Sequence, residues 1–257
     1  MNIRRSFRRH RRSLGGGTLL LGVVILFAVV CSPLAVRASV AKKQLPIYCV
    51  QRDDKCVSLT FDAAWGNEDT QTLIDILGKY KVKATFFVVG AWVDKYPESV
   101  KALAEAGHEV MSHSDDHAHF SQLTSAQITE NLGACNDKIE AVTGLRPTLF
   151  RCPYGEYDDH VIEAVNSLGM HVIQWDVDSL DWKEYDAPTI FDRVTTSVAS
   201  GSIVLFHNAA LHTPEALPDI IEYLLANGYR IVPVSELLLQ GDYELDHTGR
   251  MCRPGTA

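Results

Sequence analysis

The sequence predicts an α/β domain built as a (β/α) barrel or a strongly curved parallel sheet. Short apolar runs alternate with amphipathic stretches from residue 55 onward, which is the pattern of repeated βα units. Several amphipathic stretches end in a glycine placed where a helix stops, namely Gly107, Gly144, Gly169 and Gly228. No internal repeat or low-complexity segment divides the chain after residue 40, so one domain is expected there.

The expected elements follow one another along the chain. About seven parallel strands are predicted, at residues 56–61, 84–89, 109–112, 148–151, 171–175, 202–206 and 230–232. The amphipathic stretches between them predict helices at residues 70–80, 97–106, 125–143, 157–168, 187–199 and 217–227. Together these units make a domain of residues 55–240, and residues 241–257 are expected to be a carboxyl-terminal tail.

Residues 39–54 are predicted to form a short strand or hairpin ahead of this domain. Cys49 and Cys56 bracket a polar hexapeptide that is typical of a turn. The two thiols either form a cross-strand disulfide or remain reduced and half-buried.

Residues 1–38 are typical of a segment that directs a chain into a membrane. Six arginines precede Ser13, and the 24 residues from Ser13 to Val36 carry no charge. An apolar run of this length can cross a bilayer, and a basic leader stays on the cytoplasmic side. The segment is therefore expected to be a cleaved signal peptide or a single-pass membrane anchor, with the domain after it exported.

The rest of the chain is acidic. Without the seven arginines of the first 37 residues, 17 basic residues stand against 32 acidic ones, a net charge of −15. Because such a body repels phosphate backbones, no nucleic-acid partner is expected. Hydrophobic residues make up 46% of the chain and charged residues 22%, which excludes a disordered or collagen-like protein.

Ionisable side chains follow five of the predicted strands. They are Asp62 after the first strand, His113 after the third, Arg151 with Tyr154 at the fourth, Asp176, Asp178 and Asp181 after the fifth, and His207 after the sixth. Working groups in barrels and open parallel sheets lie at the carboxyl ends of the strands. The sequence therefore predicts one site at this rim.

His113 and His117 are spaced to hold a divalent ion such as zinc from one side of a turn. Solvent-facing histidines on an acidic loop are the alternative, and their place after a strand favours the metal. Asp62 follows an apolar strand, so it is expected to be partly desolvated and to serve as a general base. Its alternative role is a helix cap near Glu68, for which Asn67 is better placed.

Arg151 and the turn that ends at Tyr154 and Gly155 supply a guanidinium and backbone N–H groups. A guanidinium can orient a carboxylate, and turn N–H groups can face an oxyanion, whereas a structural turn with an exposed arginine is the alternative. His207 would be a general acid if a neighbouring aspartate holds it protonated. These groups predict metal-assisted hydrolysis of an amide or ester.

Five short motifs follow one another in the domain: Thr60-Phe61-Asp62, His113-Ser-Asp-Asp-His117, Arg151-Cys-Pro-Tyr154-Gly155, Asp178-Ser-Leu-Asp181-Trp182 and Leu205-Phe-His207. With these motifs the chain resembles the polysaccharide deacetylases, carbohydrate esterase family four, over residues 55–240. Residues 60–66 and 174–183 are most similar to the sporulation-associated branch of endospore-forming bacteria. The family implies a distorted (β/α) barrel that removes N-acetyl groups from peptidoglycan or a chitin-like polymer outside a bacterial cell.

The resemblance also implies catalytic roles. Asp62 would be the base that activates water, and Arg151 would orient it. The Tyr154 N–H would stabilise the oxyanion, and His207, tuned by Asp178, would protonate the leaving amine.

The implied metal site departs from the family pattern in one position. His113 and His117 would be ligands of a divalent metal, with zinc or cobalt the expected ions. The family's first motif has a second aspartate as third ligand, and here Ala63 stands at that position. Two imidazoles and water bind a metal less well than three protein ligands, and Asp115, Asp116 or His119 are possible substitutes.

Four residues are expected to contact the glycan. Trp182 and Leu205 would line the pocket for the acetyl methyl group, and Trp65 and Asp181 would be further substrate contacts. Trp175 lies inside a predicted strand, which favours core packing. A monomer is expected.

Two other functions remain open. One is a non-catalytic glycan-binding envelope protein that kept the barrel while Ala63 removed the metal. The other is an esterase that removes O-acetyl groups with the same machinery.

Overall fold

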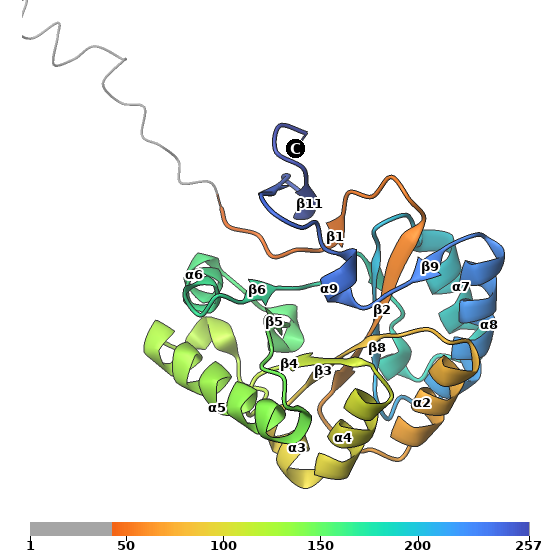
Figure 1. Cartoon of the computed structure of the whole chain (residues 1–257), viewed down its shortest axis with the longest axis horizontal. Coiled ribbons are helices and arrows are strands. Elements are labelled where there is room, and N and C mark those ends of the chain that lie inside the picture. Colours follow the sequence, from red (N-terminus) through yellow and green to blue (C-terminus); the bar gives the residue numbers. More distant parts are fainter. Residues whose placement is uncertain (1–42, 257) are drawn as a thin grey trace, which may run out of the picture. The chain divides into compact units, whose positions relative to one another are not determined.

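The computed structural model describes residues 43–256, in which helices surround a curved, half-barrel sheet of parallel strands (Figure 1). Its strands are β2 (Cys56–Ala63), β3 (Thr85–Val88), β4 (Glu109–Ser112), β5 (Leu149–Phe150), β6 (His171–Val172), β7 (Val177–Asp178), β8 (Ile203–His207) and β9 (Arg230–Ile231). Seven of them lie in the order β6-β5-β4-β3-β2-β8-β7, and β9 pairs with the start of β2. The seven predicted strands are present, and β7 is additional because two residues ending in an aspartate give no apolar run.

The helices connect these strands and cover the outside of the sheet (Figure 1). They are α2 (Thr70–Lys79), α3 (Gly90–Lys95), α4 (Pro97–Glu105), α5 (Ser125–Thr143), α6 (Asp159–Ser167), α7 (Ala187–Ser197), α8 (Thr213–Ala226) and α9 (Val234–Leu237). Three 3₁₀ helices are η1 (Phe120–Gln122), η2 (Pro153–Gly155) and η3 (Asp181–Lys183). The helix α8 begins four residues before its predicted start, because Pro214 fits the first turn of a helix.

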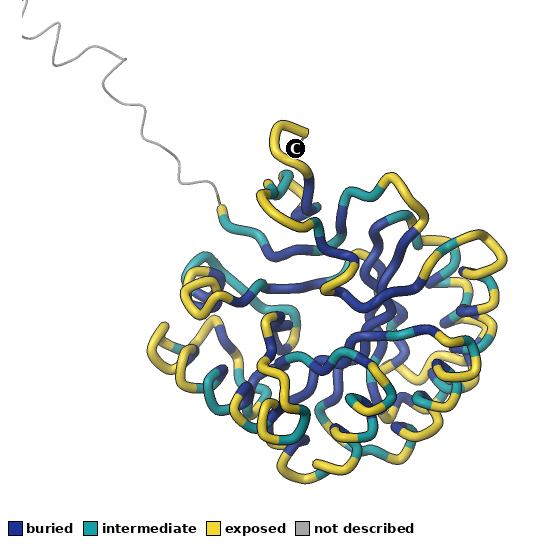
Figure 2. Tube along the Cα trace, in the orientation of Figure 1, coloured by how far each residue is buried: buried dark blue, intermediate teal, exposed yellow. Residues whose placement is uncertain are grey.

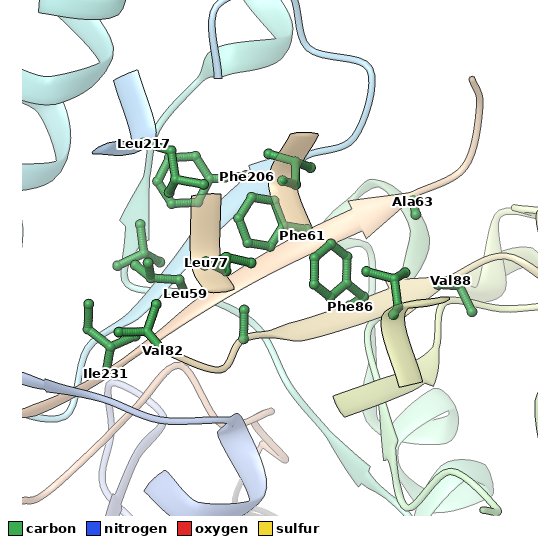
Figure 3. Close-up of a cluster of buried hydrophobic side chains, with 14 of the residues drawn as sticks. Leu59, Phe61, Ala63, Leu77, Val82, Phe86, Val88, Phe206, Leu217 and Ile231 are labelled. Carbon is green, nitrogen blue, oxygen red and sulfur yellow. The ribbon is translucent and has the colours of Figure 1, made fainter. Parts of the chain in front are cut away.

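The side chains of β2 alternate between two layers. Leu59, Phe61 and Ala63 belong to the apolar cluster that the helices cover, where Phe61 stacks on Phe86 and Phe206 at centroid distances of 4.8 and 5.4 Å (Figure 3). Strand periodicity sends Asp62 to the opposite face. The strands β2, β3 and β5 are buried along their whole length, whereas the outer faces of the helices are exposed (Figure 2).

An amino-terminal strap, residues 47–51, connects β6 with the start of β8. Ile47 N–H donates to the Val172 carbonyl at 2.9 Å, and Val50 N–H donates to the Gly201 carbonyl at 2.9 Å. A Cβ on Gly201 would lie 1.7 Å from the Val50 oxygen, and its φ of 86° is in the left-handed region. This close approach requires glycine at position 201.

The strap contains a short strand, as predicted for residues 39–54, and does not form the alternative hairpin. Its strand β1 (Cys49–Val50) pairs in parallel with β11 (Arg250–Cys252), which pairs antiparallel with β10 (Glu244–Leu245). The expected carboxyl-terminal tail therefore contains two strands, and β1 needs them as partners because the turn at residues 51–55 leads into a different sheet. Cys49 and Cys56 are free thiols, as are the other cysteines of residues 43–256.

The predicted signal or anchor lies outside the described residues. No helix among residues 43–256 has the length and apolar character that a membrane span needs.

Candidate active site

A cavity of about 540 Å³ opens at the carboxyl ends of the strands. Its walls bring together most of the predicted site residues: Asp62, Trp65, His113, His117, Tyr154, Asp178, Trp182, Leu205 and His207, with Ala64, Gly155 and Trp175. Arg151 and Asp181 are fully buried and do not line the cavity. The structure therefore places these residues at one rim, with Arg151 and Asp181 supporting it from behind.

Asp62 and Arg151 form a buried ion pair. Arg151 Nη1 donates to Asp62 Oδ1 at 2.7 Å, and both side chains are buried. Burial acts to raise the pKa of Asp62, but the charges of Arg151, His113 and His207 outweigh it and lower the pKa below its usual value. Asp62 is therefore a carboxylate at neutral pH, in the form that can accept a proton from water.

Four further contacts fix the Arg151 guanidinium. Nη1 also donates to Thr60 Oγ1 at 2.9 Å, and Nη2 donates to the Gln174 carbonyl at 3.2 Å. The guanidinium lies over the Phe87 ring, 4.3 Å from its centroid, and 5.5 Å from the Trp175 ring. Thr60 and Gln174 were not predicted as site residues, although Thr60 shares a strand face with Asp62.

The two candidate metal ligands are neighbours. His113 Nδ1–H donates to the Arg151 carbonyl at 2.8 Å, which leaves Nε2 unprotonated, 3.6 Å from Asp62 Oδ2. The rings of His113 and His117 have their centroids 5.0 Å apart. Burial lowers the pKa of both histidines, that of His117 to about 4, so both are neutral at pH 7 as metal binding requires.

A third ligand for these histidines is missing. Among residues 43–256, no group of three His, Cys, Asp or Glu side chains is arranged to hold an ion. Ala63 lies in the apolar cluster beside Phe61 and does not line the cavity. Because a catalytic zinc usually has three protein ligands, the described residues do not fit the zinc or cobalt site that the resemblance implied.

The possible substitute ligands are bonded elsewhere. Lys138 Nζ lies 2.7 Å from Asp115 Oδ1, and Asp116 Oδ1 accepts a hydrogen bond from Asn131 Nδ2 at 2.8 Å. His119 Nδ1 lies 2.9 Å from Glu156 Oε2. None of the three completes the ligand set of His113 and His117.

Asp178 was expected to be the partner of His207, but the structure shows Asp181 in this role. Asp181 Oδ1 accepts from His207 Nδ1 at 2.8 Å, and Asp181 Oδ2 accepts from the His207 backbone N–H at 2.8 Å. Burial acts to lower the pKa of His207, but the hydrogen bond and charge of Asp181 outweigh it and raise the pKa above its usual value. His207 is therefore held toward its protonated form, with Nε2 left for the cavity.

Asp178 and Asp181 have exchanged their expected places. Asp181 is fully buried, so it does not contact substrate, whereas Asp178 lines the cavity and its Oδ1 accepts from Leu180 N–H at 2.9 Å. Leu180 has a φ of 51°, and this left-handed residue reverses the chain between the two carboxylates. The sequence spacing alone does not show such a turn.

The turn that contains Tyr154 has an unusual backbone. Tyr154 has a φ of 59° and Gly155 a φ of 69°. Within the turn, Gly155 N–H donates to the Cys152 carbonyl and Glu156 N–H to the Pro153 carbonyl. The N–H groups of Gly155 and Glu156 are therefore used within the turn, and the predicted oxyanion donor, the Tyr154 N–H, is not among these bonded groups.

The proposed substrate contacts occupy different parts of the cavity. The rings of Trp65 and Trp182 are about half exposed, whereas Leu205 is buried. Trp175 lines the cavity as well as packing against the core, so its expected role was incomplete. The tryptophans offer flat apolar faces at the mouth, and Leu205 offers an apolar wall inside.

Known proteins are similar to this chain in sequence and in fold. A model of the family described as polysaccharide deacetylase matches residues 50–173. The uncharacterized protein YlxY of Bacillus subtilis is 34% identical over 75% of this chain and 60% of its own. The peptidoglycan-N-acetylmuramic acid deacetylase PdaC of the same organism is 37% identical over 73% of this chain and 40% of its own length. The chain thus spans less than two thirds of the length of either relative.

Solved structures agree with these matches. The crystal structure of BA3943, a CE4 family pseudoenzyme from Bacillus anthracis, is 36% identical and has a TM-score of 0.73, covering 75% of this chain and 68% of its own. A BA3943 mutant described as having restored enzymatic activity has a TM-score of 0.72. The structure of PdaC is 37% identical over 73% of this chain and 92% of its own, with a TM-score of 0.66. With the half-barrel and the motif residues at its rim, these matches show that the chain belongs to the polysaccharide deacetylase family.

Proposed function

We propose that the protein is an exported hydrolase that removes N-acetyl groups from peptidoglycan or a related N-acetylhexosamine polymer. The observation that carries this proposal is that two hydrogen-bonded couples meet at one cavity, Asp62 with Arg151 and His207 with Asp181. The first couple lowers the pKa of a carboxylate, as a base needs, and the second raises the pKa of an imidazole, as an acid needs.

The first step is attack of water on the acetyl carbonyl carbon. Asp62 accepts a proton from the water, while Arg151 holds the carboxylate in place. The carbonyl oxygen becomes an oxyanion, and the Tyr154 N–H donates a hydrogen bond to it. Arg151 is neutralised by Asp62 and buried behind it, so the guanidinium orients the base without leaving the substrate an exposed cation.

The second step is departure of the sugar amine. The C–N bond breaks as the tetrahedral intermediate collapses to acetate, and His207 Nε2 gives its proton to the leaving nitrogen. Asp181 stabilises the imidazolium before this transfer. No step is assigned to a metal, because the described residues supply only two neighbouring imidazoles.

The substrate assignment rests on the cavity and on the relatives. A volume of about 540 Å³ is sufficient for a sugar with its acetamide group, and Trp65 and Trp182 can stack on pyranose rings at the mouth. The relative PdaC is named a peptidoglycan deacetylase. The basic, apolar leader in front of residue 43 supports export to the cell wall, and the sequence resemblance supports a role in sporulation.

Ala63 favours a second function, a glycan-binding protein without turnover. The position that would supply a third ligand holds a buried methyl group, and the chain is similar to BA3943, which is described as a pseudoenzyme. Such a protein would bind the same polymer through the same cavity and release no acetate.

Acetate release separates the two functions. The purified full chain in detergent is given the N-acetylglucosamine hexamer or muropeptides, with chelator or with added zinc or cobalt. We expect acetate and a free amine from at least one of the glycans. Glycan binding by calorimetry without acetate under any metal condition would establish the second function instead.

A further inference from the structure

Gln174 is a buried polar residue that lies behind the cavity, between Arg151 and the turn that contains Tyr154. Only 1% of its surface is exposed. Its backbone N–H donates to the Ile47 carbonyl at 2.7 Å, and its carbonyl accepts from Arg151 Nη2 at 3.2 Å. Its side-chain Nε2 donates to the Gly155 carbonyl at 3.2 Å. One residue thus contacts both the group that orients the base and the turn that carries the oxyanion donor.

The turn at Tyr154 needs such support. A non-glycine residue with a positive φ costs about 1–2 kcal/mol, and the conformation persists only where the surroundings hold it. Tyr154 has a φ of 59°. Its ring stacks on His119 with centroids 4.2 Å apart and meets the His117 ring edge-on at 4.6 Å, but Tyr154 remains 58% exposed. The Gly155 carbonyl lies on the inner side of the turn, where it accepts a hydrogen bond from the Gln174 side chain.

The packing beneath the turn is equally close. A Cβ on Gly155 would lie 3.1 Å from the Trp175 ring and 3.7 Å from Gln174 Oε1. The Trp175 ring also lies beside the Arg151 guanidinium. A movement of residues 174–175 would therefore displace the turn and the arginine together.

We propose that Gln174 is a positioning residue that holds the oxyanion turn and the Arg151–Asp62 pair in one fixed arrangement. This inference rests on the proposed deacetylase function. Gln174 contacts neither water nor glycan, since it is buried behind the cavity wall, and it acts through Gly155 and Arg151. The strap extends this support, because Ile47 bonds to residues on both sides of Ile173.

The test compares Gln174→Leu with the wild type. Leucine has a similar volume and keeps the backbone carbonyl that Arg151 uses, but it removes the donor to Gly155. We expect kcat for acetate release to fall about tenfold with KM within about twofold, because a misplaced donor weakens only the transition state. Amide hydrogen exchange at residues 152–156 should become faster, while exchange in β2 and β8 stays unchanged. Gln71→Leu, on the exposed face of α2, is the matched control and should change neither measurement.

Unchanged kcat and unchanged exchange at residues 152–156 would overturn the proposal. Faster exchange throughout β2 and β8 would also overturn it, since Gln174 would then be a general stability residue. If the wild type releases no acetate, the deacetylase function fails, and the hydrogen exchange still decides whether Gln174 holds the turn.

Discussion

Asp181 accepts two hydrogen bonds from His207, one from the ring and one from the backbone N–H, each at 2.8 Å. Thr213 Oγ1 donates to the same carboxylate at 2.7 Å. These contacts fix the tautomer of His207 with a proton on Nδ1, so that Nε2 is the atom that exchanges protons with a substrate. The proposed general acid thus depends on a carboxylate that is buried away from the cavity.

The variant Asp181→Asn tests this dependence. Because an anion beside an imidazolium raises its pKa, removing the charge should lower the pKa of His207. Activity needs His207 protonated, so the high-pH limb of the profile should move to lower pH, while the low-pH limb set by Asp62 stays. The profile of kcat against pH checks this. An unmoved high-pH limb would mean that another group is the acid.

Arg151→Met tests the buried ion pair. Removing one partner leaves Asp62 buried without a countercharge, which costs about 3–5 kcal/mol of unfolding free energy. The double variant Arg151→Met with Asp62→Asn should recover part of this loss. Urea unfolding measures both. Arg230→Met removes a pair with Asp54 at the surface and should cost much less unfolding free energy than Arg151→Met. Equal costs at the two sites would contradict the account of Arg151.

Gly201→Ala tests the strap. The new methyl group would collide with the Val50 carbonyl, and the positive φ adds strain, so we expect a loss of about 3 kcal/mol or more. Gly169→Ala is the control, since Gly169 has a similar φ of 71° but open space around it, and it should lose about 1–2 kcal/mol. Urea unfolding compares the two variants. Equal losses of unfolding free energy in the two variants would show that the Val50 carbonyl does not restrict residue 201.

Ala63→Asp tests the metal site. Residue 63 ends β2, and its carbonyl accepts a hydrogen bond from the N–H of Val89, which follows β3. The strand β3 lies between β2 and β4, and His113 follows β4. A carboxylate in this buried apolar position should lower the melting temperature without metal, and zinc should restore it by drawing residue 63 out of the apolar cluster so that its carboxylate joins the two histidines. Zinc should have little effect on the wild type. A variant whose melting temperature does not respond to zinc would show that residue 63 does not reach the histidines.

The sequence predicted the fold well where the signal is local. Apolar runs located β2 and also short strands such as β5, but β7 was missed because its single valine stands between two aspartates and gives no apolar run. The pairing of residues 250–252 with the strap could not be predicted, because a pairing between the two ends of a domain leaves no local sequence pattern.

The candidate site was predictable as a set of residues and not as a set of partners. Strand ends placed Asp62, His113 and His207 at one rim. Which of Asp178 and Asp181 bonds to His207 depends on the positive φ of Leu180, and a leucine in the sequence does not predict a positive φ. Gln174 was missed because its importance lies in one backbone carbonyl and one amide group, and neither requires a particular neighbour in the sequence.

Acetate release by Asp62→Asn compared with the wild type, on the N-acetylglucosamine hexamer, is the most direct test of the central claim that this cavity is a hydrolytic site with Asp62 as its base. Asparagine keeps the shape and a hydrogen bond to Arg151 but cannot accept the proton of water. We predict that the wild type releases acetate and that the variant, folded and still able to bind the hexamer, releases it at least about 100-fold more slowly. Equal rates for the two proteins would contradict this account.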